Sequence, residues 1–514
     1  MSASREKRLR RELREAEANS DTVKKVKKKK KQRTPAQKKK LHSIISTTIG
    51  ILIVLAFALL IFVNSGVLQK NATAVTIGSH KLSPAEFNYF YQDTYNNLKN
   101  TYTSYGYWDY IVDTSKPIAS QECGLSGDGS TWSEYIRASA ISSAVQVYAL
   151  YDAAQEAGYT LSEDAQADLD SASETVTTYA KENDFKDADD YLEEYYGKGA
   201  SLESYLNYLT VQQYASGYSQ EKSDSFSYTD EELRTYYNDN KQDFDTVTYR
   251  VFNIATEDDD TNAAKETADA MAADLDGTES SFSDAAYEYA PEDSKESYED
   301  EDYTLRSNYN YSSISSDYAD WLFSEERTAG ESQVFATSSG YAVVMFVSRE
   351  NNEYSTVNVR HILIEVATSG EDGTSTDADW DECLSKIEEI EEEWEASDMT
   401  EETFATMAEE QSEDTGSASN GGLYENVHKG QMVTEFNDWC FEDGRQAGDY
   451  GIVQTTYGYH LIYFCGYGDE YWKILADNSK RSEDYAAWYE EYSADYVGDS
   501  SFFGMLFTNK ELPA

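Results

Sequence analysis

The spacing of hydrophobic positions divides the chain into three regions. An uncharged apolar run occupies 44–63, and apolar and aromatic residues at helical spacing dominate 78–243. Beyond that region, short strand-like runs alternate with helical segments. The clearest helical stripe consists of Phe87, Phe90, Tyr91, Tyr95 and Leu98. We predict a tyrosine-rich helical domain over 78–243, in which aromatic stripes build the core and surplus tyrosines supply an adaptable surface.

The apolar run is long enough to cross a membrane, because a helix of 20 residues rises ~30 Å. The preceding segment, 1–43, contains 17 basic and 5 acidic residues, whereas the rest of the chain has a net charge of −66. The positive-inside tendency leaves 1–43 in the cytoplasm and the acidic bulk outside a bacterial cell. We predict a single-pass signal anchor over 44–63. A cleaved signal peptide ending near "ATA" at 72–74 is the alternative.

Charge argues against nucleic acid as a partner, and the cysteine content argues against a disulfide framework. A lysine-rich segment such as 1–43 can bind nucleic acid. Directly before a membrane span, however, it determines the orientation of the span and binds anionic lipid headgroups. The acidic bulk repels nucleic acid, so we predict no such partner. Four cysteines make no disulfide framework. Cys440 and Cys465 are either core thiols or a pair.

A repeated pattern fills the second half of the chain. The aligned stretches are 247–257 with 357–367, and 317–347 with 435–465. Each copy reads as a strand, helices, a short helix and two strands, which makes a compact α+β module. We predict two tandem modules, 246–350 and 355–468.

Two histidines distinguish the copies. His361 and His460 occupy strand positions where the first copy has Val251 and Ala342. By strand alternation both histidines share a face with apolar residues, so neighbouring strands would bring the imidazoles together. Without a third ligand of suitable spacing the pair predicts no metal site, and no hydrolase motif supplies a nucleophile.

Four motifs occur in order over about 356–466: "VRHILI", "FATMAEEQSEDTGSASNGG", "GQMVTEF" and "TTYGYHLI". Together they resemble the parvulin class (PpiC or rotamase type) of peptidyl-prolyl cis/trans isomerases. The whole chain is similar to membrane-anchored, extracytoplasmic bacterial foldases, in which helices from both ends form a chaperone domain. The resemblance implies that 78–243 is chaperone-like, that 469–514 is a C-terminal helix packing on it, and that the first module is degenerate.

The resemblance also implies a site. The positions that match the family's active-site group are His361, His460, Asp414 and Thr455. The positions that match its substrate-binding pocket, two of them with unusual residues, are Met432, Phe436, Tyr424 and Tyr457. Tyr424 replaces an aliphatic residue, and Tyr457 stands in place of Ser or Phe. Because no basic cluster accompanies the pocket motifs, specificity for phosphoserine-proline is not implied.

The implied reaction needs no cofactor. Rotation about an X-Pro bond faces a barrier of ~18–20 kcal/mol and takes tens to hundreds of seconds unaided. A pocket that grips the proline ring, excludes water and holds a histidine pair in place favours the twisted state. We expect an extracytoplasmic foldase with chaperone activity, acting on unfolded or partly folded exported polypeptides. The alternative is a non-catalytic holdase with a vestigial isomerase site, and the oligomeric state stays open.

Overall fold

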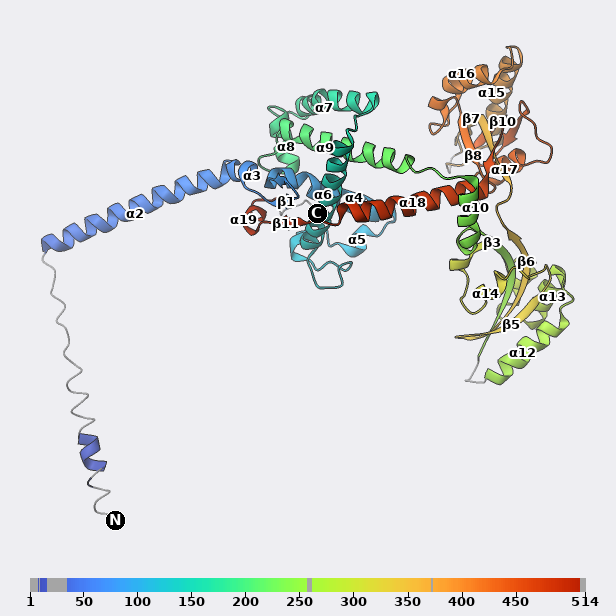
Figure 1. The fold of residues 1–514 in the computed structure, drawn as a ribbon, viewed down its shortest axis with the longest axis horizontal. Helices are drawn as coiled ribbons and strands as arrows, with labels where there is room; N and C mark the ends of the chain where they lie inside the picture. The colour runs from blue at the N-terminus through green and yellow to red at the C-terminus, as the bar shows by residue number, and fades with distance from the viewer. Residues whose placement is uncertain (1–7, 9, 16–34, 257–260, 371–372, 509–514) are drawn as a thin grey trace. The chain divides into compact units, whose positions relative to one another are not determined.

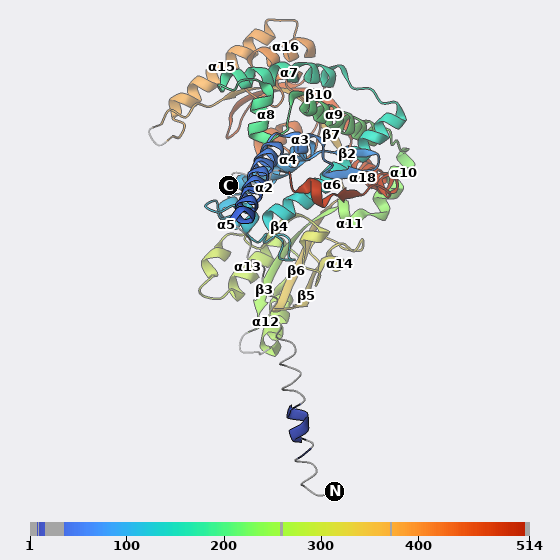
Figure 2. The ribbon, with the colours of Figure 1, turned by 90° about the vertical axis from the view of Figure 1, so that its left-hand side faces the viewer.

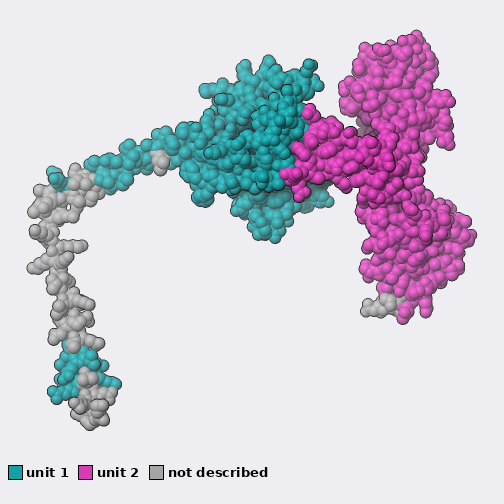
Figure 3. All heavy atoms as spheres, viewed as in Figure 1, with its two compact units in different colours: residues 1–219, 492–514 teal, residues 220–491 magenta. Residues whose placement is uncertain are grey.

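The computed structural model describes residues 8, 10–15, 35–256, 261–370 and 373–508. It divides the chain into two compact units, coloured separately in Figure 3: unit 1 comprises 1–219 and 492–514, and unit 2 comprises 220–491. Most of the predicted basic segment, 1–43, lies outside the described residues.

A long helix, α2 (Pro35–Asn64), contains the apolar run. Its window Ser46–Val63 is long and apolar enough to cross a membrane by length and composition, and none of the window is buried. Among the described residues it is the one helix with these properties. The helix begins before the predicted span because the preceding lysines and glutamine are good helix formers.

Unit 1 is helical apart from one small sheet. Helix α4 starts where Ser83 accepts a hydrogen bond from the Glu86 amide and the Glu86 carboxylate accepts one from the Ser83 amide. The predicted stripe on this helix is confirmed, since its Phe and Tyr members are buried. The helices of unit 1 after α2 are α3 (Val67–Asn71), α4 (Pro84–Ser104), α5 (Trp108–Ile111), η1 (Ile118–Ser120), α6 (Trp132–Ala157), α7 (Glu163–Glu182), α8 (Ala188–Tyr196), α9 (Leu202–Asp224, which continues into unit 2) and α19 (Phe502–Met505).

The small sheet joins distant parts of the sequence. Its antiparallel order is β11 (Gly498–Ser500), β1 (Val75–Ile77), β2 (His80–Leu82), and Val75 faces Ser500. Strands of three residues are too short to show alternation, so the sequence did not predict them.

The unit boundary differs from the predicted domains. We predicted that 78–243 forms one domain and that the helix in 469–514 packs on it. Helices α10 (Asp230–Asp239) and α11 (Lys241–Phe244) belong instead to unit 2, as does α18 (Tyr471–Ser493) up to residue 491. The physical reason is a small core between α10 and α18, made by Leu233, Tyr237, Trp472 and Ala476.

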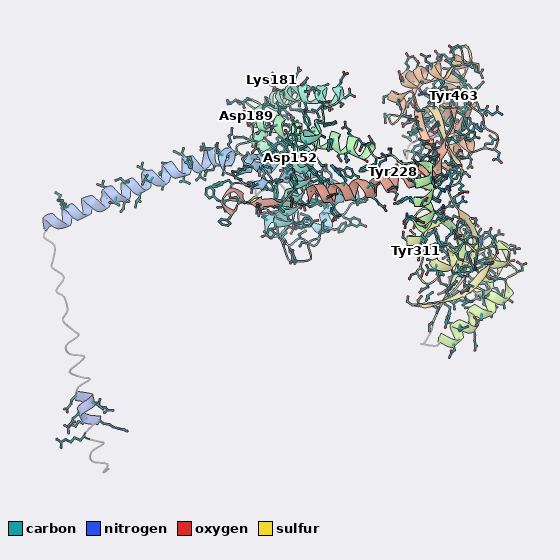
Figure 4. The ribbon with its side chains drawn as sticks, viewed as in Figure 1. Asp152, Lys181, Asp189, Tyr228, Tyr311 and Tyr463 are labelled. Atoms are coloured by element: carbon teal, nitrogen blue, oxygen red, sulfur yellow. The ribbon has the colours of Figure 1, made fainter. Side chains whose placement is uncertain are left out.

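Polar contacts strengthen this packing within unit 2. The Arg481 guanidinium donates to the carbonyls of Ser223 and Phe226 at 2.8 and 2.7 Å. The hydroxyl of Tyr228, labelled in Figure 4, donates to Asp484 at 2.8 Å. Helix α18 is therefore held by the end of α9, by the residues that follow it and by α10.

The first module is a four-stranded antiparallel sheet of order β4-β3-β6-β5. Helices α12 and α13 cover one face of it, and Figure 2 shows α13 and α14 on opposite sides of its strands. Its elements are β3 (Thr246–Ala255), α12 (Thr261–Asp274), α13 (Glu279–Tyr289), η2 (Lys295–Glu299), β4 (Leu305–Asn310), η3 (Tyr311–Ser313), α14 (Ala319–Leu322), β5 (Ser332–Thr337) and β6 (Gly340–Glu350).

The second module repeats the arrangement with the order β8-β7-β10-β9 (Figure 1). Each sheet contains one strand, β4 or β8, that the sequence did not predict, because both follow turn-rich segments without a clear alternation. The α+β class is confirmed. The elements are β7 (Ser355–Glu365), α15 (Asp377–Glu395), α16 (Glu401–Gln411), η4 (Ala418–Asn420), β8 (Leu423–Val427), α17 (Thr434–Cys440), β9 (Tyr450–Gln454) and β10 (Gly458–Glu470).

Candidate active site

Strands β7 and β10 are antiparallel neighbours, and they bring the two histidines together. His361 lies opposite Ile462 and His460 lies opposite Leu363, so the imidazoles meet on one face of the sheet. Their Nδ1 atoms are 3.1 Å apart, and both side chains are buried. The other face of β10 carries Tyr463, labelled in Figure 4, which packs in the core beneath α15 and α16. The predicted meeting of the histidines is therefore observed.

A polar chain extends from both ends of the pair. His361 Nε2 is 2.9 Å from Asp414 Oδ2, and His460 Nε2 is 2.9 Å from Thr455 Oγ1. The Thr455 oxygen also accepts the Tyr457 amide at 3.2 Å. All four ring nitrogens thus have partners within the protein.

The two ends of this polar chain, Asp414 and Thr455, determine which nitrogen of each imidazole carries the proton. Asp414 as a carboxylate only accepts, so His361 carries its proton on Nε2 and presents a lone pair at Nδ1. His460 must then carry its proton on Nδ1, and its Nε2 accepts from the Thr455 hydroxyl. Every donor has an acceptor when both imidazoles are neutral, so the arrangement is self-consistent in one tautomeric state.

Burial keeps the pair uncharged. Desolvation lowers the pKa of His361, and the nearby Asp414 carboxylate opposes this shift. Desolvation, followed by repulsion from His361, lowers the pKa of His460 to about 3. Both imidazoles are accordingly neutral near pH 7, in agreement with the hydrogen-bond pattern.

Asp414 is held as a carboxylate by a tight turn. Burial alone would raise its pKa, but hydrogen bonds from Ser417, His361 and the Gly416 amide lower the pKa to about 2. Ser417 Oγ donates to Oδ2 at 2.5 Å and the Gly416 amide to Oδ1 at 3.1 Å. Sequence reasoning missed Ser417, although a hydroxyl shortly after an aspartate is typical of such turns.

Tyr424 contributes more than a pocket wall. Its ring lies 5.4 Å from that of His361, and its hydroxyl donates to Asp414 Oδ2 at 3.1 Å. An aliphatic residue would supply only the wall. The unusual residue in this chain therefore adds a donor to the polar chain.

A cavity of about 360 Å³ opens above the imidazoles. The Phe436 ring meets both imidazoles edge-on, with centroids 5.5 and 5.4 Å away. Thr455 lies behind His460 rather than in the cavity wall. The lining, which includes four residues that the sequence did not indicate (Leu363, Glu365, Gln431 and Val433), consists of His361, Leu363, Glu365, Asp414, Tyr424, Gln431, Met432, Val433, Phe436, Tyr457 and His460.

A glycine pair brings the backbone close to the site. Gly421 and Gly422 have φ angles of 64° and 69°, in the left-handed region that favours glycine. The His361 amide donates to the Gly422 carbonyl at 2.9 Å. A Cβ at position 422 would lie 2.2 Å from the His361 carbonyl oxygen, so only glycine allows this approach.

The cysteines take no part in the site. Cys440 and Cys465 are free thiols, and burial raises the pKa of each to about 12. They are core or partly buried thiols rather than a disulfide.

Comparison with protein families decides the class of these modules. Residues 345–465 match a family described as PPIC-type PPIase domain, and residues 228–358 match another family of the same description. The chain carries two PPIC-type PPIase domains. The predicted parvulin class is thereby confirmed for both modules, including the first PPIC-type domain, which has Val251 and Ala342 at the histidine positions.

Curated relatives match over a short stretch. The foldase protein PrsA of Exiguobacterium sibiricum is 42% identical over 59 residues, which are 12% of this chain and 19% of the relative. Foldase protein PrsA 3 of Bacillus cereus is 45% identical over 62 residues, 12% of this chain and 21% of the relative. The chain thus spans about a fifth of the length of the curated relatives it matches.

Two crystal structures of peptidylprolyl isomerase (PrsA) are also similar. The Bacillus cereus protein has 20% identity and a TM-score of 0.18, over 28% of this chain and 50% of that chain. The Bacillus anthracis protein has 23% identity and a TM-score of 0.19, over 30% of this chain and 58% of that chain.

Proposed function

We propose that the second PPIC-type domain catalyses cis/trans isomerisation of X-Pro bonds in polypeptides. The observation that supports this proposal is the neutral His361–His460 pair, fixed by Asp414 and Thr455 beneath an apolar cavity. The cavity has room for a proline ring and its flanking peptide groups. Phe436 and Met432 supply its apolar wall.

The geometry favours catalysis without a covalent intermediate. Because every imidazole nitrogen is engaged inside the protein, the site leaves no ring lone pair to attack a carbonyl. The resonance that stabilises the planar amide separates charge, and an apolar wall stabilises the twisted state, which has less charge separation, relative to the planar one. The polar chain holds the cavity floor in one arrangement, so that the cavity is organised before substrate arrives.

The test uses the full chain and a matched pair of variants. Phe436 aligns with Tyr318 of the first domain, and both side chains are buried. Phe436→Ala should lower the rate of exchange of an Ala-Pro peptide, measured by NMR, at least tenfold, whereas Tyr318→Ala should leave it unchanged. Equal rates in the two variants would contradict a site in the second domain, and a parent without activity would refute the proposed function.

The proposed location is the outer face of a bacterial cell membrane, with α2 as a single-pass anchor. Support comes from the apolar window Ser46–Val63, the basic segment before it and the acidic bulk after it. The PrsA relatives are named foldases. Protease added to cells without their wall should digest the bulk of the chain and spare 1–43, and protection of the bulk would refute this topology.

A second proposed activity is the holding of unfolded clients by unit 1. Tyr105, Tyr107 and Tyr110 are 70%, 59% and 85% exposed within one short stretch around α5. Tyrosine rings provide apolar area that adapts to many sequences. We propose that this cluster contacts unfolded or partly folded exported polypeptides.

The holding activity can be separated from isomerisation. Replacement of Tyr105, Tyr107 and Tyr110 by Ser should weaken the suppression of aggregation of an unfolded protein severalfold, while peptide isomerisation keeps the parent rate. His460→Ala should show the opposite pattern. If the triple variant suppresses aggregation as well as the parent does, the cluster is not the client surface.

A further inference from the structure

Helix α19 and the residue after it present a cluster of exposed apolar side chains. Phe502, Phe503 and Leu506 are 85%, 56% and 47% exposed. Single exposed apolar residues are common on soluble proteins, but adjacent phenylalanines and a leucine on one turn form a contiguous patch. We name residues 502–506 the apolar turn.

The apolar turn is fixed to unit 1 by its backbone. The Ser501 amide donates to the Ala74 carbonyl at 2.8 Å, and Ser501 Oγ accepts the Gly504 amide at 3.2 Å. Gly504 lies so close to Thr73 that a Cβ would be 1.8 Å from the Thr73 carbonyl oxygen. The exposure of Phe502 is therefore a property of an anchored turn.

The segment before the turn is anchored as well. The Tyr496 hydroxyl donates to Asp152 Oδ2 at 3.0 Å, and His80 Nε2 lies 2.8 Å from the other oxygen of that carboxylate. Asp152, labelled in Figure 4, belongs to α6. Strand β11 then pairs with β1 immediately before Ser501. These contacts hold the backbone that carries the two phenylalanines in place.

Chain length places the apolar turn near the end of the apolar helix. The apolar window ends at Val63, and α3 (Val67–Asn71) lies between it and Thr73, against which Gly504 packs. Ten residues extend about 15 Å as a helix and at most about 35 Å when fully extended. The headgroup layer on each side of a bilayer is roughly 5–8 Å thick. A segment tethered to Val63 by ten residues can therefore reach this layer. Figure 1 shows α3 and α19 at the same end of unit 1.

We propose that the apolar turn inserts into the outer headgroup region of the membrane that α2 crosses. This inference rests on the proposed anchoring by α2. Phenylalanine and leucine gain from burial at the boundary between headgroups and acyl chains. The part of the chain after 1–43 has a net charge of −66, so attraction to anionic lipids does not explain the contact, and insertion should persist in neutral phosphatidylcholine and at high salt.

The test measures the depth of a probe in the full chain reconstituted into phosphatidylcholine liposomes. Cys465→Val removes the one cysteine that is not fully buried, and the first domain has Val347 at that position. An environment-sensitive fluorophore is then attached at Phe502→Cys, or at Tyr110→Cys as a matched control. Phe502 and Tyr110 are both 85% exposed in the protein.

The probe at 502 should emit at shorter wavelength than the probe at 110, resist quenching by aqueous iodide at least threefold better, and be quenched by a nitroxide on the lipid headgroup. Because the fluorophore is itself apolar, a second protein combines Phe502→Cys with Phe503→Ser and Leu506→Ser. Its probe should return to the behaviour of the probe at 110.

The outcomes distinguish this inference from the anchoring on which it rests. If the protein does not float with the liposomes, the anchor assignment fails. If it floats and iodide quenches both probes equally, the inserted turn is refuted. If protection at 502 grows with protein concentration without quenching from the lipid, a second copy covers the turn and the inference is also refuted.

Discussion

In the second PPIC-type domain the His361 amide donates to the Gly422 carbonyl at 2.9 Å, and in the first the Val251 amide donates to the Thr304 carbonyl at 3.0 Å. The same backbone bond thus joins β7 or β3 to the residue just before β8 or β4, while the side chains around it differ. The two domains share a scaffold, and they differ in what the scaffold holds.

An arginine shows the shared part. Arg250 Nε donates to Glu279 at 3.0 Å, and the aligned Arg360 Nε donates to Glu401 at 2.9 Å. In both domains the guanidinium also reaches backbone carbonyls of the segment before β4 or β8. This arginine links α13 or α16 to the segment before β4 or β8. Its role is structural, and it is present in both domains whether or not the histidine pair is present.

The histidine positions show the part that differs. Val251 and Ala342 are buried and apolar, so the first domain has no polar chain to satisfy there. A half-satisfied buried chain is less stable than an apolar core, so apolar residues at both positions are more favourable than a single histidine. The glycine pair is replaced as well, by Tyr303 and Thr304. The comparison teaches that the sheet folds without the site and that the site needs several residues at once.

The largest expected effect comes from moving the first domain's residue into the second. Gly422→Thr should lower the free energy of unfolding of the second domain by roughly 3 kcal/mol, since a Cβ would lie 2.2 Å from the His361 carbonyl oxygen. Isomerase activity should fall at least a hundredfold. Proteolysis under native conditions and the peptide exchange assay measure the two effects. The reciprocal Thr304→Gly is the control and should leave activity unchanged.

The next effect is a loss of stability of the second domain between pH 7 and pH 5 that depends on His460. The pKa of His460 is about 3 in the folded protein and ~6.5 when unfolded, so the unfolded state binds more protons below pH 6.5. The stability contribution is complete above that pH and is lost as the pH falls toward 3. Between pH 7 and pH 5 the parent should lose roughly 2 kcal/mol more than His460→Gln does.

Hydrogen exchange of the β7 and β10 amides, compared between parent and variant at each pH, measures this difference. The β3 and β6 amides of the first domain, which has no histidine, serve as the internal control. An equal loss in parent and variant would contradict the buried neutral pair.

A smaller effect concerns the end of the polar chain. Thr455→Val removes the donor to His460 Nε2 and should reduce kcat/KM about tenfold, equivalent to about 1.4 kcal/mol. The aligned Thr337→Val in the first domain should not change kcat/KM. Steady-state kinetics on one X-Pro peptide compares them, and equal kcat/KM for Thr455→Val and the parent would show that the His460 tautomer does not depend on Thr455.

The last substitutions should have no effect on activity. Val251→His together with Ala342→His restores the pair in the first domain but not the glycine pair. In a chain that also carries His460→Ala, these two substitutions should not restore isomerisation. Recovery of even a tenth of the parent rate would show that the histidines alone make the site.

The sequence predicted those parts of the site that depend on strand alternation and on recognisable motifs. The meeting of His361 and His460 follows from two strands whose faces are fixed by their apolar neighbours. Ser417 and the hydroxyl of Tyr424 were not predicted in their roles, because they reach Asp414 through a turn whose path the pattern does not determine. Residues of one strand can be assigned to a face, whereas residues of a loop need coordinates.

The fold shows the same division. Helices with strong caps, such as the one that follows Ser83, were predicted, and so was the repeat. The prediction placed α18 on 78–243, which includes α10, but it did not single out α10, because an amphipathic helix reveals that it needs an apolar partner without revealing which one. Trp472 packs with Leu233 and Tyr237 of α10 within unit 2.

The pairing of Val75 with Ser500 has a consequence for the order of folding. Unit 2 is an insertion in the sequence of unit 1, since 220–491 lie between its two parts. During synthesis from the N-terminus, β1 emerges early, and the edge that faces β11 stays unpaired until the last part of unit 1 arrives. Both PPIC-type domains can therefore complete their sheets first, and unit 1, which contains α2, is the last to complete its sheet.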